Sequence, residues 1–285
     1  MRTQPTALSP SVRNLVLACG IRGFPLFTVP SQMTKPKAAH FLSSQEASFR
    51  YVEKTNPASS NLAFLTYGVY ELTGAIESGA LSYANEEALL FCIKGDASAT
   101  LDGKDYPLHH YDVLYVPRGS SYRLKQKQGE TRIVVCRAPC EKSHPAFHSS
   151  WSETSTNEKR IRHLKGKDVF LMFDVSEGAD KLIAGYTIFQ PHQRSWPPHN
   201  HTDQEEIYIF TKGRGSMEVY ADEETKSFVR SVGEGDAITI PLLNYHPVFS
   251  QEEELHFIWC IAGNRYWVGD KNKDFMTGKV DKLTT

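Results

Sequence analysis

Three histidines and two glutamates in the second half of the chain have the types and spacings of ligands for a divalent metal ion. His199 and His201 are two residues apart, and on a strand residues i and i+2 point to the same face. Glu205 and Glu206 follow at the start of an apolar run, and His246 lies further along. Imidazole and carboxylate ligands together favour Zn²⁺, Mn²⁺, Fe²⁺, Ni²⁺ or Co²⁺ over a soft metal. The sequence therefore predicts a mononuclear metal site.

Spacing favours Glu206 over Glu205 as the carboxylate ligand. Six residues separate Glu206 from the turn residue Gly213, and the alternation of a strand places the two glutamates on opposite faces. His246 is predicted as the fourth ligand, because a strand that ends at Pro241 and a turn would bring it back to the pocket. The alternative is a polar pocket without metal, but three buried imidazoles beside a carboxylate would be costly without an ion.

The elements that must position these residues are predicted to be almost entirely β-strands. From about residue 50, short runs rich in Val, Ile, Tyr and Phe alternate with Gly, Asp and Asn turn residues, a pattern typical of sandwiches and barrels. The runs include 88–93, 112–116, 132–136, 169–173, 207–210, 216–220, 237–240 and 256–261. Residues 150–160 are polar and lack aliphatic side chains, so they are interpreted as a linker between two halves.

The two halves are related by an internal repeat. Four residues of the first half have counterparts 124 positions later: Asp112, Pro117, Tyr122 and Cys136 correspond to Asp236, Pro241, His246 and Cys260. A constant offset with matching chemistry indicates a duplicated domain. We therefore expect a variable or disordered extension at 1–45, one barrel at 46–149, the linker at 150–160 and the metal-binding barrel at 161–285.

The first copy lacks the set of metal ligands. Tyr122 stands at the position of His246, and Tyr83 and Asn85 lie where a histidine pair would be expected. Glu87 is interpreted as the remaining glutamate of the motif, with Gly95 after it. The first barrel is therefore predicted to be metal-free and structural.

The region around the ligands resembles the two cupin motifs, G-x5-H-x-H-x(3,4)-E-x6-G and G-x5-P-x-G-x2-H-x3-N. All four ligand positions match, and the departures are Gln193, Leu243 and Ser250, none of which is a ligand. Leu243 stands where the motif has a turn glycine. The resemblance implies an all-β bicupin, in which two cupin barrels (double-stranded β-helix, or jelly-roll) follow one another in tandem.

Composition narrows the classes of partner. Lys and Arg number 32 and Asp and Glu 33, which gives a net charge of −1 and no reason to expect nucleic acid or a membrane as partner. No apolar run approaches the roughly 18 residues of a membrane span. Five cysteines without a CxxC pair indicate a reduced, cytoplasmic protein. The first 45 residues contain no Asp or Glu, so a leader, a disordered extension or a start site placed before Met33 are all open.

Residues 60–275 resemble the bicupin sugar-acid isomerases, which act on 5-deoxy-glucuronate in inositol catabolism or on 5-dehydro-4-deoxy-D-glucuronate in pectin catabolism. The segments 195–201, 244–248, 262–267 and 272–275 are similar to the inositol branch, whereas the short gap between His201 and Glu206 and the segment 257–259 are closer to the pectin branch. The resemblance implies a metal-dependent aldose–ketose isomerase of a deoxy-uronate, with 5-deoxy-glucuronate as the first choice. An Fe²⁺ cupin dioxygenase and a non-catalytic sugar-binding bicupin are the alternatives.

The resemblance also implies one divalent ion per chain, with zinc or manganese ahead of iron, nickel and cobalt, and a small sugar acid as substrate. A homo-oligomer is expected by analogy with the family. Isomerisation also needs a base for the C–H proton, and the candidates on neighbouring strand faces are Glu218, Tyr208 and His256. The substrate-binding candidates are Arg194, Lys212 or Arg214 for the carboxylate, and Tyr220.

Overall fold

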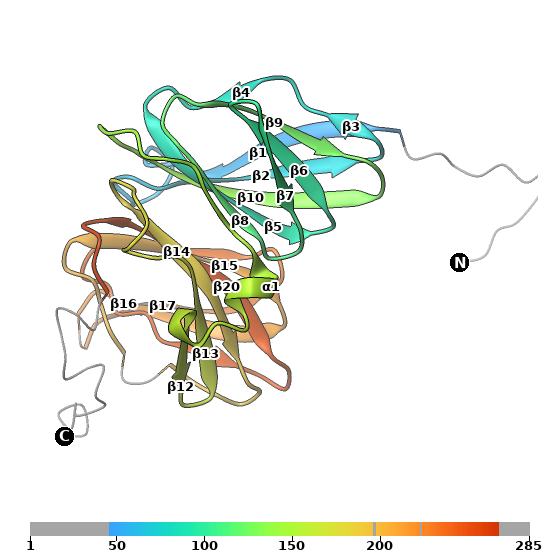
Figure 1. Ribbon diagram of the computed structural model, residues 1–285. Helices are drawn as coiled ribbons and strands as arrows, with labels where there is room; N and C mark the ends of the chain where they lie inside the picture. The colour runs from blue at the N-terminus through green and yellow to red at the C-terminus, as the bar shows by residue number, and fades with distance from the viewer. Residues whose placement is uncertain (1–45, 196–197, 223, 268–285) are drawn as a thin grey trace, which may run out of the picture. The chain divides into compact units, whose positions relative to one another are not determined.

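Strands make up nearly all regular structure in the part of the chain that the computed structural model describes, which is residues 46–195, 198–222 and 224–267 (Figure 1). The first half contains β1 (Ser48–Thr55), β2 (Thr66–Thr73), β3 (Ile76–Glu77), β4 (Leu81–Ser82), β5 (Glu86–Lys94), β6 (Ala97–Leu101), β7 (Lys104–Leu108), β8 (Val113–Val116), β9 (Ser121–Gln126), β10 (Glu130–Pro139) and β11 (Phe147–Ser149). The second half contains β12 (Ile161–Leu164), β13 (Lys167–Phe173), β14 (Leu182–Phe189), β15 (Gln204–Lys212), β16 (Arg214–Tyr220), β17 (Lys226–Gly233), β18 (Ala237–Ile240), β19 (Val248–Ser250) and β20 (Leu255–Gly263). The leader or extension predicted at 1–45 lies outside the described residues.

Each half is a pair of antiparallel sheets. In the first half, one sheet has the order β1-β2-β10-β5-β8-β11 and the other the order β3-β9-β6-β7, with β4 on β9. In the second half the orders are β12-β13-β14-β20-β15-β18 and β17-β16-β19. Strands at the outside of a barrel alternate between buried and exposed residues, as β9 does, because one face packs inward and the other meets solvent. The predicted class, all-β with two tandem barrels, is confirmed.

Three apolar cores hold the strands together. One lies inside the first barrel around Leu90 and Leu124, and a second lies inside the other barrel around Phe210 and Phe257. The third joins residues of both halves, among them the repeat-related pair Cys136 and Cys260. The central strands β5 and β15 are buried on both faces because they pack into their own barrel on one side and into this shared core on the other.

Two buried glutamates tie the halves together in the same way. Glu205 accepts hydrogen bonds from three successive backbone N–H groups of the first half, at 63–65, over 2.5–2.7 Å. Glu87 accepts from three successive N–H groups of the second half, at 180–182, over 2.7–3.0 Å, and also from the Tyr115 hydroxyl. Each carboxylate thus has charge-assisted hydrogen bonds where water is excluded.

These contacts correct the interpretation of Glu87. Glu87 and Glu205 are 118 positions apart, as are Gly95 and Gly213, so Glu87 is the counterpart of Glu205 and not of the ligand candidate Glu206. The offset becomes 124 only after the β16–β17 hairpin, which is longer than β6–β7. The counterpart of Glu206 is Ala88, so the first barrel has no carboxylate at that position.

Tyrosines fill the place in the first barrel that the metal-ligand candidates take in the second. The Tyr70 hydroxyl lies 2.8 Å from that of Tyr122 and is also hydrogen-bonded to that of Tyr83. Tyr70 and Tyr122 are about 1% exposed. A hydrogen-bonded cluster of phenols satisfies the buried polar atoms without an ion.

The stretch at 150–160 contains the short helix α1 (Trp151–Thr154) and a 3₁₀ turn (Glu158–Arg160). Trp151 packs edge-on against Tyr111 and at a tilt against Phe170 of β13, and its backbone N–H donates to Asp112 Oδ1. The segment between the halves is therefore anchored. Its role as a domain linker stays a prediction.

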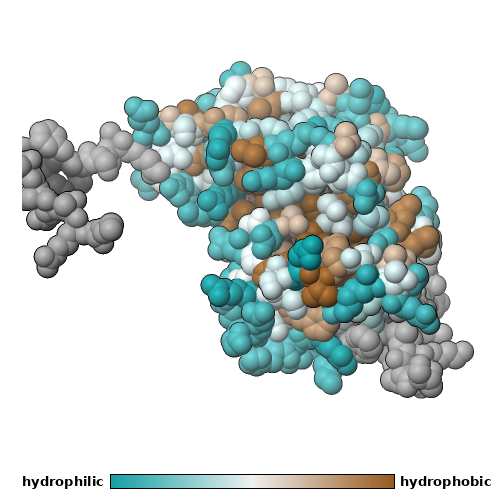
Figure 2. All heavy atoms as spheres, turned by 180° about the vertical axis from the view of Figure 1, so that it is seen from behind, coloured by the Kyte–Doolittle hydropathy of each residue, from teal (hydrophilic) through white to brown (hydrophobic). Residues whose placement is uncertain are grey.

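Hydrophobic surface is divided among several patches on the face of the molecule drawn in Figure 2. In Figure 2 hydrophilic residues cover most of the surface, and hydrophobic surface appears in small separate patches. The large hydrophobic residues that are exposed within the described ranges are Leu164, Val229, Leu242 and Leu243. No helix in the described part of the chain is long and apolar enough to cross a membrane. The expected homo-oligomer stays a prediction.

Candidate metal centre

The four predicted ligands come together inside the second barrel. One side-chain nitrogen or oxygen from each of His199, His201, Glu206 and His246 lies within 4.8 Å of all the others. The Nε2 atoms of His201 and His246 are 3.0 and 3.1 Å from Glu206 Oε2. His201, Glu206 and His246 are each at most 3% exposed.

Strand β15 and two loops bring these four residues together. Glu206 lies on β15 between Ile240 of β18 and Ile261 of β20, and its side chain faces the barrel interior. The two loops that carry the histidines are joined by a 2.7 Å hydrogen bond from the Leu243 N–H to the His201 carbonyl. Leu243 has φ = 64°, a conformation that favours glycine, so this chain keeps the turn of the cupin motif with a leucine in it.

Hydrogen bonds on the far side of two imidazoles fix which nitrogen faces the centre. His246 Nδ1 is 2.9 Å from the Asn244 carbonyl, an acceptor, so Nδ1 carries a proton. His201 Nδ1 is 2.9 Å from Gln204 Oε1. The Gln204 amide cannot be reversed, because its Nε2 donates to the carbonyls of Asn264 and Tyr266. Both histidines thus present Nε2 to the centre. In metal sites a hydrogen bond to the other ring nitrogen commonly orients a ligand histidine in this way.

The charges of the cluster fit a cation. Burial tends to raise the pKa of Glu206, but the neighbouring His201 and His246 side chains outweigh it and lower the pKa to about 2. Burial and repulsion from His246 and His201 hold the pKa of His199 well below its ordinary value. The buried Nε2 of His246 faces the carboxylate without making a hydrogen bond. Without an ion, either the Nε2 lone pairs would face the carboxylate and be repelled by it, or the histidines would become buried imidazolium ions. Both arrangements are costly, so the residues present fit a divalent metal ion.

A cavity of about 120 Å³ adjoins the cluster. This volume is below the 300–1,000 Å³ of pockets for drug-sized ligands, which points to a small metabolite. The cavity is lined by Arg162, Leu164, Lys167, Val169, Thr187, Phe189, Ser195, His199, His201, Glu206, Tyr208, Val248, Phe257, Trp259, Ile261 and Trp267.

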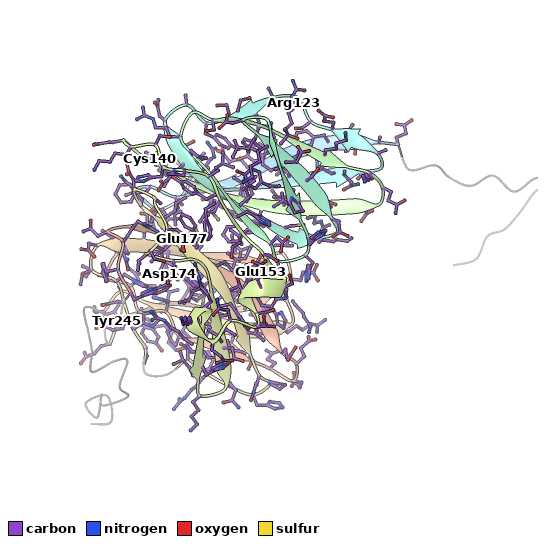
Figure 3. The ribbon with its side chains drawn as sticks, viewed as in Figure 1. Arg123, Cys140, Glu153, Asp174, Glu177 and Tyr245 are labelled. Atoms are coloured by element: carbon purple, nitrogen blue, oxygen red, sulfur yellow. The ribbon has the colours of Figure 1, made fainter. Side chains whose placement is uncertain are left out.

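The segment after β20 is fastened as part of the cavity wall. Arg265 donates to the carbonyls of Asp174, Glu177 and Leu182, and the Trp267 indole N–H donates to Asp174 Oδ1 over 2.7 Å. Asp174 and Glu177 lie near one another in the second half (Figure 3), and the Asp174 N–H donates to Glu177 Oε2. Trp267 is thereby fixed beside the cavity.

Of the predicted catalytic residues, the structure brings Tyr208 to the cavity. Its ring centroid is 5.6 Å from that of His246. Burial, with the Glu206 carboxylate adding to it, raises the pKa of Tyr208 well above its ordinary value. The hydroxyl therefore keeps its proton and is a hydrogen-bond donor rather than a base.

Glu218 and His256 are placed away from the cavity lining. Glu218 on β16 is hydrogen-bonded to Tyr220 and paired with Lys226 at 3.1 Å. His256 lies 3.1 Å from the Tyr111 hydroxyl of the first half, where it belongs to the contact between the halves. Their residue types matched the chemistry, but the strand faces on which they lie do not point to the cluster.

The predicted substrate-binding residues are also outside the cavity lining. Lys212 is paired with Glu254 at 3.0 Å, and Tyr220 contacts Glu218 and Lys226. Arg194 forms an isolated bridge with Phe249 and lines a different surface hollow. The cationic and hydroxyl residues that do line the cavity, Lys167 and Ser195 among them, were not identified by sequence reasoning.

Comparison with protein families places most of the chain in one of them: residues 39–277 match the model of the KduI/IolB family. Two curated relatives are named 4-deoxy-L-threo-5-hexosulose-uronate ketol-isomerase. The protein from Opitutus terrae is 23% identical over 64% of this chain and 68% of its own length. The protein from Oceanobacillus iheyensis is 24% identical over 60% of this chain and 65% of its own length. The chain thus spans about two thirds of these relatives.

Solved structures support the fold. An IolB-like protein from Salmonella typhimurium aligns with a TM-score of 0.64 at 18% identity, over 79% of this chain and 92% of that one. Oxalate decarboxylase from Bacillus subtilis aligns with a TM-score of 0.63 at 13% identity, over 84% and 81%. At these identities the likeness concerns the fold alone, and it confirms the bicupin architecture.

Proposed function

The chain belongs to the KduI/IolB family, and from this premise we propose that it is a metal-dependent ketol-isomerase of a deoxy-uronate. The observation that carries the proposal is the three-histidine, one-glutamate cluster beside a cavity of small-metabolite size. The names of the curated relatives support the reaction type.

The reaction moves hydrogen between two adjacent carbons without net oxidation. A divalent ion, for which we propose zinc or manganese, would supply a Lewis acid that polarises the sugar carbonyl. His199, His201, Glu206 and His246 would hold it. Tyr208 keeps its proton, so it is suited to donate a hydrogen bond to a sugar oxygen. The apolar and aromatic side chains of the lining exclude water from the reacting carbons.

For the particular sugar acid, the first candidate is 4-deoxy-L-threo-5-hexosulose uronate, another name for the 5-dehydro-4-deoxy-D-glucuronate of the pectin branch. Three curated relatives carry its name. The second candidate is 5-deoxy-glucuronate of the inositol branch, favoured by the segments 195–201 and 262–267.

The test is elemental analysis of the purified protein, followed by an anaerobic assay with both deoxy-uronates. We expect about one divalent ion per chain and turnover of one of the two substrates without oxygen. His246→Ala should lose both the metal and the turnover, whereas His256→Ala, a histidine outside the cluster, should keep its metal. Oxygen consumption would instead support a dioxygenase, and full turnover by metal-free His246→Ala would refute the proposal.

A further inference from the structure

Lys167 carries a positive charge into the cavity at a place that the sequence did not suggest. It is the first residue of β13 and pairs with Leu164 of β12 and Phe189 of β14. Its Nζ lies 5.1 Å from the centre of the Phe189 ring and donates to Ser195 Oγ over 2.9 Å. The ammonium group is thus held by one neutral hydroxyl and one aromatic face beside the His/Glu cluster.

This ammonium group has no carboxylate partner within 4.0 Å among the residues that the structure describes. Among the described residues that line the cavity, Glu206 is the only carboxylate, and it lies against His201 and His246. An ammonium ion partly withdrawn from water without an anion is costly, so its retention indicates that an anion arrives from outside. Burial lowers the pKa of Lys167 to about 8, while the Glu206 carboxylate acts in the opposite direction.

The surroundings of Lys167 also favour an anion. Arg162 is the second cation of the lining and stacks on Trp267 at 4.2 Å. Trp259 lines the same cavity, and its buried indole N–H has no hydrogen-bond partner within the described ranges. With a divalent ion in the cluster, the ion and Lys167 together carry more positive charge than Glu206 balances among the described residues, and the Trp259 N–H is an unused donor there. Such a cavity attracts anionic molecules and offers them donors.

We propose that Lys167 binds the carboxylate of the sugar acid and so makes the cavity selective for uronates over neutral sugars of the same length. This inference rests on the proposed function for the identity of the sugar. It gives Lys167 the role of carboxylate partner that the sequence had suggested for the surface residues Arg194 and Lys212. A hydrogen bond between an ammonium group and a carboxylate is charge-assisted and therefore strong, and a neutral sugar lacks the group that would form it.

The test compares two open-chain ligands that are not isomerised, L-gulonate and its neutral counterpart sorbitol, on metal-loaded protein by calorimetry or ligand-observed NMR. In wild type the affinity for gulonate should exceed that for sorbitol. In Lys167→Met this preference should fall about 10- to 100-fold, as expected for a lost charged hydrogen bond, while metal content stays unchanged. Lys212→Met, a lysine outside the cavity lining, should leave the preference intact.

Other outcomes separate this inference from the proposed function. If wild type does not prefer gulonate, or if Lys167→Met keeps the preference, the role of Lys167 is refuted. If Lys167→Met weakens the binding of gulonate and of sorbitol equally, Lys167 supports the cavity wall and does not bind the carboxylate. That result would also refute the proposed role of Lys167. Gulonate preference that depends on Lys167, in a protein that isomerises neither deoxy-uronate, would sustain the inference and reject the isomerase.

Discussion

Glu205 and Glu206 are adjacent in the chain but face opposite sides of β15, so the same substitution at each should have different consequences. Glu206→Gln changes the metal cluster, whereas Glu205→Gln changes the contact between the two halves. We predict that Glu205→Gln lowers the free energy of unfolding and leaves the metal content of the folded protein unchanged. Glu206→Gln should lower metal content and activity.

The magnitude for Glu205→Gln follows from its three hydrogen bonds. Oε1 accepts from Phe64 and Leu65, and Oε2 accepts from Ala63. A glutamine oxygen can keep the first two as neutral bonds, each weaker than the charged bond by about 1 kcal/mol. The amide NH₂ would face the Ala63 N–H, which loses its acceptor at a cost of about 1–3 kcal/mol. The total is about 3–5 kcal/mol, or a fall in Tm of about 10 °C for a chain of this size.

The measurement is denaturant and thermal unfolding of both variants, with metal content determined on the folded fraction. Glu87→Gln is a matched variant, because Glu87 makes the equivalent three bonds from the first half and lies outside the second barrel. It should lose stability to a similar extent and keep its metal. If Glu205→Gln retained its midpoint but lost the metal, the assignment of the two glutamates to opposite faces would be wrong.

Two further predictions concern the fold. Leu243 has φ = 64° and is 53% exposed, so Leu243→Gly relieves a conformational cost of about 1–2 kcal/mol against a glycine entropy cost of about 0.5–1 kcal/mol. The unfolding midpoint should stay equal or rise, whereas Leu242→Gly should lower it, and a clear loss for Leu243→Gly would contradict this reasoning. Burial tends to raise the pKa of Asp180, but hydrogen bonds from His144 and two backbone N–H groups lower it to about 2. The stabilisation of the folded protein by ionised Asp180 is therefore present above pH 4 and is lost as the pH falls towards 2. Wild type and Asp180→Asn should thus differ in free energy of unfolding at pH 6 and converge near pH 2. A constant difference over that range would count against the shift.

The sequence predicted the positions that depend on strand periodicity. The count from Glu206 to Gly213 selected one glutamate of two, because alternate residues of a strand share a face. His199 and His201 lie in the loop before β15 rather than on the strand that their spacing suggested, yet both side chains reach the cluster. The repeat likewise predicted two barrels, because Asp112 and Asp236 occupy equivalent turns before β8 and β18.

Other residues of the cavity could not be found in this way, because their proximity depends on strand order rather than on spacing. Lys167 is separated from Glu206 by strands β14 and β20 in the sheet. Gln204 lies in the sequence between the ligand candidates His201 and Glu206. Its role nevertheless depends on the carbonyls of Asn264 and Tyr266, about 60 positions away. The candidates Glu218 and His256 were chosen by residue type from adjacent strands, and residue type does not say which barrel face a strand presents.

The corrected assignment of Glu87 shows that two adjacent positions of the repeat have different functions. In each half, the second residue of strand β5 or β15 is a glutamate that accepts hydrogen bonds from the backbone of the other half, and this position is retained at Glu87 and Glu205. The next position faces the barrel interior, and it is Ala88 in one half and Glu206 in the other. Because the two positions point in opposite directions, the first barrel could exchange its interior for a tyrosine cluster without disturbing the contact between the halves. The contact therefore constrains both halves, whereas the proposed chemistry constrains the second alone.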